Sequence, residues 1–299
     1  MIRAIQSIHS PALDQFFLFV TDLHHETVYI LLLPLMLWLY DKRFTRYMTS
    51  VFLLGYWSNG LMKDFFHTGR PSPDDVRVVR PETSGAFPSG HSQNPLMFWG
   101  ALALQVRKTW VTVALVVVIF LIGLSRLYLG VHWPLDVIGG WTIGALMLLG
   151  FEVTRSFWIG DGMKLGQKLF WALAIPSAAF LVSALAGQVP ALSTPKEAAG
   201  EVFLVTGAYF GFWIGSILEE EWVRFDPRLG GLLIQVLKVV IGVALIMAVK
   251  EGFKLFLPAT ALGDLIRYFF VALMATLGAP WVFSKMVPAA PTVGRGIAK

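Results

Sequence analysis

Residues 109–128 read TWVTVALVVVIFLIGLSRLY, an apolar run in which Arg126 is the only charged side chain. A helix needs about 20 consecutive, mainly apolar residues to cross the hydrocarbon core of a bilayer. Apolar runs of about 15 to 20 residues recur along the whole chain of 299 residues. The sequence therefore predicts an all-α fold, a polytopic membrane helical bundle.

The composition supports this class. Hydrophobic residues make up 56% of the chain and charged residues 14%, whereas soluble domains carry about 25% charged residues. The chain has no cysteine, which excludes disulfides, thiolate metal sites and cysteine nucleophiles. The net charge is +5 and its basic residues fall in short loops, so they indicate membrane orientation, and we expect no nucleic-acid partner.

We expect about nine transmembrane helices, preceded by an N-terminal interfacial helix at residues 12–23. The predicted spans are residues 27–40, 46–66, 92–106, 109–128, 134–154, 168–187, 199–218, 230–249 and 262–285. Residues 1–155 then form a catalytic domain of the interfacial helix and five spans. Residues 156–299 form a C-terminal membrane module of about four spans, either a separate unit or a layer supporting the first five.

Basic residues lie in alternate loops. They are Lys42, Arg43, Arg46, Arg107, Lys108, Arg155, Lys164, Lys168, Arg224 and Arg228. By the positive-inside rule these loops are cytoplasmic. The intervening loops face the other side, which places them on the outer, periplasmic side of a cell (inner) membrane protein.

Those outer loops carry three polar clusters at the edges of apolar segments. They read KDFFHTGRP (Lys63–Pro71), FPSGH (Phe87–His91) and SRLYLGVHWPLD (Ser125–Asp136). Ionisable residues at membrane depth usually mark function. Hydrolysis of a phosphate ester needs cations for the phosphoryl oxygens, a nucleophile and an acid for the leaving oxygen, and each has a candidate here.

The first two clusters offer phosphate ligands and an acid. Arg70 can bind phosphate through two parallel hydrogen bonds and Lys63 as a point charge, although Lys63 alone could simply snorkel to the interface. Gly90 permits close backbone approach at the start of a helix, where Ser89 can add a hydroxyl. His91 could then act as general acid; the alternative is an ordinary helix cap with an interfacial histidine.

The third cluster offers a nucleophile. Pro134 suits the first turn of a helix, which places His132 at its entrance and Asp136 one turn inside. A carboxylate beside an imidazole fixes its tautomer and leaves the other nitrogen free to attack. Arg126 would supply another guanidinium. The alternative is that Asp136 only caps the helix.

Together, the three clusters resemble the signature of the type 2 phosphatidic acid phosphatase family: K-x(6)-R-P, P-S-G-H and S-R-x(5)-H-x(3)-D. Every defining position is filled, and the resemblance covers roughly residues 10–155. It implies a metal-independent phosphatase that needs no cofactor and forms a phosphohistidine. The implied roles are nucleophile for His132, its orientation for Asp136, acid and later base for His91, and phosphate binding for Lys63, Arg70, Arg126, Ser89 and Gly90. Vanadium haloperoxidases share the signature, but they are soluble, and the strong hydropathy argues against their chemistry.

The expected substrate is a phosphate or pyrophosphate monoester of a membrane lipid, such as undecaprenyl pyrophosphate, phosphatidylglycerophosphate, phosphatidic acid or a sphingoid-base phosphate. The motifs contact the phosphate and do not distinguish these lipids. A lipid transporter or channel, with the phosphatase-like half as a headgroup-binding platform, is the alternative.

Other polar residues receive a structural interpretation. Asn59 could orient Lys63 or bond between helices, and Gln93 could contact a headgroup or cap its span. We expect the charged residues of the C-terminal spans, among them Lys238 and Arg267, to snorkel or to pair across helices. The run Glu219-Glu220-Glu221 is expected to be a solvated helix end.

Overall fold

The computed structural model describes residues 1–160, 162–187, 189, 191 and 202–286, and these contain helices and no strand. The helices are α1 (Ile2–Gln6), α2 (Pro11–Asp22), α3 (Glu26–Leu39), α4 (Lys42–Phe66), α5 (Gly90–Val106), α6 (Thr109–Tyr128), α7 (Pro134–Val153), α8 (Arg155–Ile159), α9 (Leu165–Leu185), α10 (Val202–Leu218), α11 (Leu232–Phe256), α12 (Ala261–Leu273) and α13 (Ala279–Met286). Two short π-helical turns, η1 (Glu219–Val223) and η2 (Met274–Gly278), follow α10 and α12. The all-α prediction is confirmed.

Within the described residues, six helical segments are long and apolar enough to cross a bilayer: α6, α7, α9, α10 with η1, α11, and α12 continued through η2 and α13. The pair α2 and α3, bent by 46°, would make a seventh if counted as one broken span. The nine predicted spans are therefore not confirmed. Helices α3 and α5, with 14 and 17 residues, are short for a membrane span. Helix α4 has 25 residues but carries charges near both ends. That α3, α4 and α5 cross, and that α2 lies at the surface, stay predictions.

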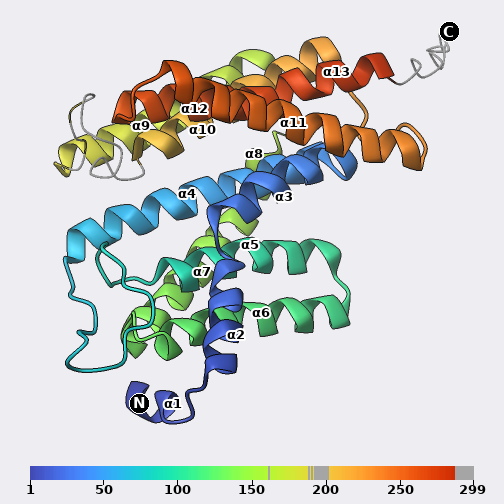
Figure 1. Cartoon of the computed structure of the whole chain (residues 1–299). Helices are drawn as coiled ribbons and strands as arrows, with labels where there is room; N and C mark the ends of the chain where they lie inside the picture. Colours follow the sequence, from blue (N-terminus) through green and yellow to red (C-terminus); the bar gives the residue numbers. More distant parts are fainter. Residues whose placement is uncertain (161, 188, 190, 192–201, 287–299) are drawn as a thin grey trace, which may run out of the picture.

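The first half of the chain forms a bundle whose polar loops meet at one end (Figure 1). Helix α5 packs against α4, α6 and α7. Because neighbouring helices run in opposite directions, the last turns of α4 and α6 and the first turns of α5 and α7 lie at the same end, on the left of Figure 1. The alternation of spans thus brings the three polar clusters together.

Helix α2 crosses α6 and ties the N-terminus to that end of the bundle (Figure 1). Ser10 caps it, its side chain accepting a hydrogen bond of 3.2 Å from the Leu13 amide. Phe17 stacks on Tyr128 with ring centroids 4.3 Å apart, and the Tyr128 hydroxyl donates to Asp14 at 2.7 Å. The helix is therefore anchored by both apolar and polar contacts.

The C-terminal helices α9–α13 form a layer over α3 and α4 (Figure 1). Within it, α10 approaches α12 so closely that a Cβ on Gly207 or on Gly211 would lie 2.1 Å from a carbonyl oxygen of α12. Small residues spaced by four permit such contact between membrane helices. The beginning of the predicted span 199–218 lies outside the described residues.

The acidic run after α10 joins this layer to α4, and the prediction of a solvated helix end was wrong. Glu219 is buried and accepts a hydrogen bond from Lys42 Nζ at 2.9 Å. Glu220 pairs with Arg46 at 3.0 Å and with Lys168 at 2.8 Å. A buried carboxylate needs such partners, and here basic residues near the starts of α4 and α9 supply them.

Candidate active site

His132 and Asp136 are placed by the start of α7. His132 is buried, and its Nδ1 lies 3.3 Å from Asp136 Oδ2. The same carboxylate oxygen accepts a hydrogen bond of 2.7 Å from the Trp133 amide, so Asp136 caps the helix and also contacts the imidazole. The two interpretations of Asp136 are therefore compatible. The contact leaves the Nε2 of His132 facing away from the helix.

Arg70 faces that Nε2 from the long loop between α4 and α5. Its Nη1 lies 3.1 Å from His132 Nε2 and donates to the Val131 carbonyl at 2.7 Å. Its Nε donates to the Ser84 carbonyl at 2.7 Å. Burial, followed by the charges of Arg126 and Arg70, holds the pKa of His132 well below its ordinary value. The imidazole is therefore neutral at pH 7, as a nucleophile must be.

Arg126 lies at the end of α6 with its side chain fully buried. Its Nη1 donates to Thr21 Oγ1 at 2.7 Å, and its Nη2 donates to Glu82. The other carboxylate oxygen of Glu82 lies 3.4 Å from Arg70 Nη2. Glu82 thus bridges the two guanidinium groups from the loop. Burial raises its pKa, but Arg126 and Arg70 lower it more, so the net pKa falls and the carboxylate is ionised.

Lys63 reaches the same loop from the last turn of α4. Its Nζ donates to Ser84 Oγ at 3.1 Å, and Arg70 Nη2 donates to that oxygen at the same distance. Ser84 therefore holds two of the predicted phosphate-binding cations side by side. The simple alternative that Lys63 only snorkels does not describe this contact.

Ser89 and Gly90 open α5 against α4 and α7. The Ser89 amide donates to the Asp136 carbonyl at 3.0 Å, and Asn59 Nδ2 donates to the Pro88 carbonyl at 3.2 Å. A Cβ on Gly90 would lie 2.8 Å from Asn59 Oδ1, so only glycine fits there without a shift. Asn59 accordingly braces this loop, and its Nδ2 donates to Gln93 Oε1 inside the bundle at 2.9 Å.

Among the described residues, the buried polar atoms of this end without a partner include Ser89 Oγ, Ser92 Oγ and Arg126 Nε. Buried polar groups are normally hydrogen-bonded. The first amides of α5 are also free of a side-chain cap, and helix N-termini of this kind bind anions. Hydroxyl and amide donors of this kind suit the oxygens of a phosphoryl group.

His91 follows in the first turn of α5 and contacts a histidine that the sequence analysis missed. The rings of His91 and His24 are T-shaped, with centroids 4.7 Å apart. His24 lies between α2 and α3, and its Nδ1 forms a hydrogen bond of 2.8 Å with the Tyr29 hydroxyl. His91 also interacts electrostatically with His132. Each predicted site residue therefore belongs to one connected cluster.

Sequence reasoning also missed Glu82, Ser84 and Thr21 as members of the cluster. The signal for His24 was a histidine pair, His24-His25, between two apolar segments. No local pattern marked Thr21, because its role depends on how α2 crosses α6.

Comparison with known proteins identifies the family. Residues 43–158 match the PAP2 superfamily, and residues 203–291 match the family described as PAP2 superfamily phosphatase, transmembrane extension. Phosphatidylglycerophosphatase B of Bacillus subtilis is 33% identical over 108 residues, which cover 33% of this chain and 50% of that protein. Dihydrosphingosine 1-phosphate phosphatase YSR3 of Saccharomyces cerevisiae is 29% identical over 181 residues, which cover 54% of this chain and 44% of that protein.

A third relative is matched over more of its length. This is YbjG of Escherichia coli (strain K12), provisionally named an undecaprenyl-diphosphatase, which is 32% identical over 148 residues, covering 46% of this chain and 71% of that protein. The chain spans about half the length of the first two relatives, at 50% and 44%. These matches confirm the resemblance drawn from the three motifs: the chain is a multi-pass membrane protein that belongs to the PAP2 superfamily.

Proposed function

We propose that this protein is a lipid phosphatase that removes a phosphate or pyrophosphate group from a membrane lipid through a phosphohistidine, without a metal ion. The observation that carries the proposal is the arrangement around His132, with Asp136 on one nitrogen and the Arg70 guanidinium facing the other. A phosphoryl group held by Arg70, Arg126 and Lys63 would then lie in front of the attacking nitrogen.

The reaction has two steps. His132 Nε2 attacks phosphorus, and the bond from phosphorus to the lipid oxygen breaks. His91, which takes up a proton when the anionic phosphate lies beside it, gives that proton to the lipid oxygen. Water then attacks the phosphohistidine while His91 takes a proton from it, which releases phosphate and regenerates His132. Asp136 stabilises the imidazolium character that develops on His132. Ser89 Oγ and the Gly90 amide complete the set of donors for the phosphoryl oxygens.

The names of the relatives support a lipid substrate but differ in the lipid. They include phosphatidylglycerophosphate and dihydrosphingosine 1-phosphate phosphatases. We infer a broad lipid phosphate or pyrophosphate phosphatase with its site on the outer face of a cell membrane, as the alternation of basic loops predicts. Right-side-out vesicles should then hydrolyse a membrane-impermeant phosphate ester without detergent.

The test uses the purified full chain with a chromogenic phosphate ester and a panel of lipid phosphates, in the presence of a chelator. We expect turnover in chelator and a loss of about a thousandfold in His132→Ala. His67→Ala is the matched control, because His67 is exposed in the neighbouring loop and outside the cluster. Unchanged turnover in His132→Ala would refute the mechanism. No turnover on any lipid phosphate, together with lipid movement in liposomes, would favour a transporter.

A further inference from the structure

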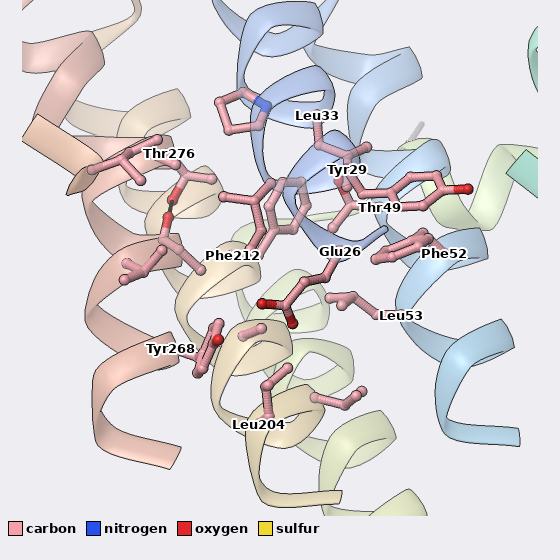
Figure 2. Close-up of a pocket in the computed structure, with 18 of the residues that line it drawn as sticks. Glu26, Tyr29, Leu33, Thr49, Phe52, Leu53, Leu204, Phe212, Tyr268 and Thr276 are labelled. Carbon is pink, nitrogen blue, oxygen red and sulfur yellow. Dashed lines mark hydrogen bonds between the residues drawn. The ribbon is translucent and has the colours of Figure 1, made fainter. Parts of the chain in front are cut away.

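A narrow apolar cavity lies where the C-terminal helices meet α3 and α4 (Figure 2). Its volume is about 120 Å³, and its walls come from α3, α4, α10, α11, α12 and η2. Apolar cavities of this order, about 150 Å³, stay dry and accept apolar ligands. The cavity is thus built jointly by both halves of the chain and is separate from the phosphate-binding cluster.

The lining of the cavity suits a hydrocarbon chain and not a phosphate. None of the described lining residues is Lys, Arg or His, and Glu26 is the only charged one. Figure 2 shows Glu26 pointing into the space, with Tyr268 and Leu204 near it. A carboxylate repels a phosphate. A headgroup would therefore stay at the arginines, and only an apolar chain would enter.

The lining of the cavity follows α3. It includes both Glu26, in the first turn, and Leu37, near the last. With a volume of about 120 Å³, the cavity has room for one segment of a hydrocarbon chain and not for a whole lipid.

One end of the cavity lies beside the catalytic cluster. Tyr29 lines the cavity wall, and its hydroxyl bonds to His24, whose ring contacts His91. Stacking on Phe52 at 4.3 Å holds Tyr29 in place. Only the side chains of Tyr29 and His24 thus stand between the cavity and His91, the proposed general acid.

We propose that this cavity is the binding site for the hydrocarbon chain of the lipid substrate. The inference rests on the proposed function and assigns a role to the C-terminal helices. The phosphate binds at Arg70 and Arg126, and the chain passes His24 and enters the cavity at its Glu26 end. Since lipid tails in the bilayer are also apolar, the cavity selects mainly by length and width.

The first experiment measures the wild-type protein on a series of alkyl phosphates of increasing chain length, at fixed mole fraction in mixed micelles. KM should fall with chain length and level off once a chain segment fills the cavity. A KM independent of chain length, in a protein that hydrolyses all members, would overturn the proposal. Failure of the wild type on every substrate would instead count against the proposed function.

The second experiment narrows the cavity from two of its lining helices, with Ala208→Phe on α10 and Ala272→Phe on α12. Ala178→Phe, at an exposed position of α9, is the matched control. Each narrowing variant should raise KM for the longest substrates about tenfold, the lower range for one methylene in an apolar pocket. Turnover of the chromogenic ester, which has no chain, should stay within about twofold.

The same data separate the substrate's chain from a resident bilayer lipid. A resident lipid predicts equal losses on the chromogenic ester and on every chain length, with loss of lipid that co-purifies with the protein. That result would overturn the proposal, as would unchanged KM for the longest substrates in both variants. If either variant fails to fold, the wild-type chain-length series still decides the question.

Discussion

Both halves of the chain bury charged side chains, but their partners come from different distances along the sequence. Arg126 is fully buried and bonds Thr21 and Glu82, which belong to α2 and to the loop before α5. Lys238 in α11 is equally buried, and it bonds the carbonyls of Pro227 and Leu229 at 3.1 and 2.8 Å. The first side chain joins distant segments, whereas the second only closes a local turn.

Arg267 repeats the local pattern. It pairs with Asp264 three residues earlier in α12, so the expected pairing across helices occurs within one helix. Its Nε is buried without a partner in the described chain, as is that of Arg126. An unpaired guanidinium nitrogen therefore does not mark a site. Of these three buried cations, only Arg126 has its hydrogen-bond partners in distant segments of the described chain.

Replacement of each buried arginine by lysine gives the largest expected contrast. Arg126→Lys should lower kcat/KM about a hundredfold, because an ammonium group cannot donate to Thr21 and Glu82 and still offer a planar face to phosphate. Arg267→Lys should stay within about twofold of the wild type. Steady-state kinetics on the chromogenic ester measure both, with thermal unfolding as the check on folding. Similar losses of kcat/KM in the two variants would contradict the functional distinction between Arg126 and Arg267.

Replacement of Lys63 and of Lys238 extends the comparison, with smaller expected effects. Lys63→Met should lower kcat/KM about tenfold with little change in Tm, because it removes one cation from the phosphate site. Lys238→Met should leave kcat unchanged and lower Tm, since it leaves two carbonyls without a donor at a cost of about 1–3 kcal/mol. Exchange of these two outcomes would contradict the assignment of Lys63 to the site.

Thr21 tests whether the convergence includes α2. Thr21→Val keeps the shape of the side chain and removes the hydroxyl that accepts from Arg126. We expect kcat/KM to fall about three- to tenfold, the value of one hydrogen bond. Thr27→Val, at an exposed position of α3, is the control and should behave as the wild type. Unaltered kinetics in Thr21→Val would show that α2 does not contribute to the active site through Thr21.

The smallest effect concerns pH. Because burial lowers the pKa of His132 below its ordinary value of 6.5, this nucleophile stays neutral as the pH falls through 6.5 and becomes protonated only below it. The acid limb of kcat/KM, which reports the free protein, should therefore have its midpoint below pH 6.5. A midpoint above pH 6.5 would show that the burial of His132 does not act on its ionisation. The measurement is a pH profile of kcat/KM with the chromogenic ester.

Much of the site was predictable because its residues occur in short motifs at helix ends. Pro134 and Asp136 were expected to open a helix, and they do. Glu82 and His24 were not predictable, because their neighbours depend on the path of a loop and on the crossing of α2 over α6. Likewise, no pattern around Glu219 indicates that Lys42, at the distant start of α4, bonds it.

The sequence by itself determined the membrane class, the all-helical fold and the motif residues, because apolar run length, loop charge and residue spacing are local properties. Only the tertiary structure decided which charges are shared and which are local. It also created the apolar cavity between the halves, since a cavity exists only once helices distant in sequence have packed and left space between them.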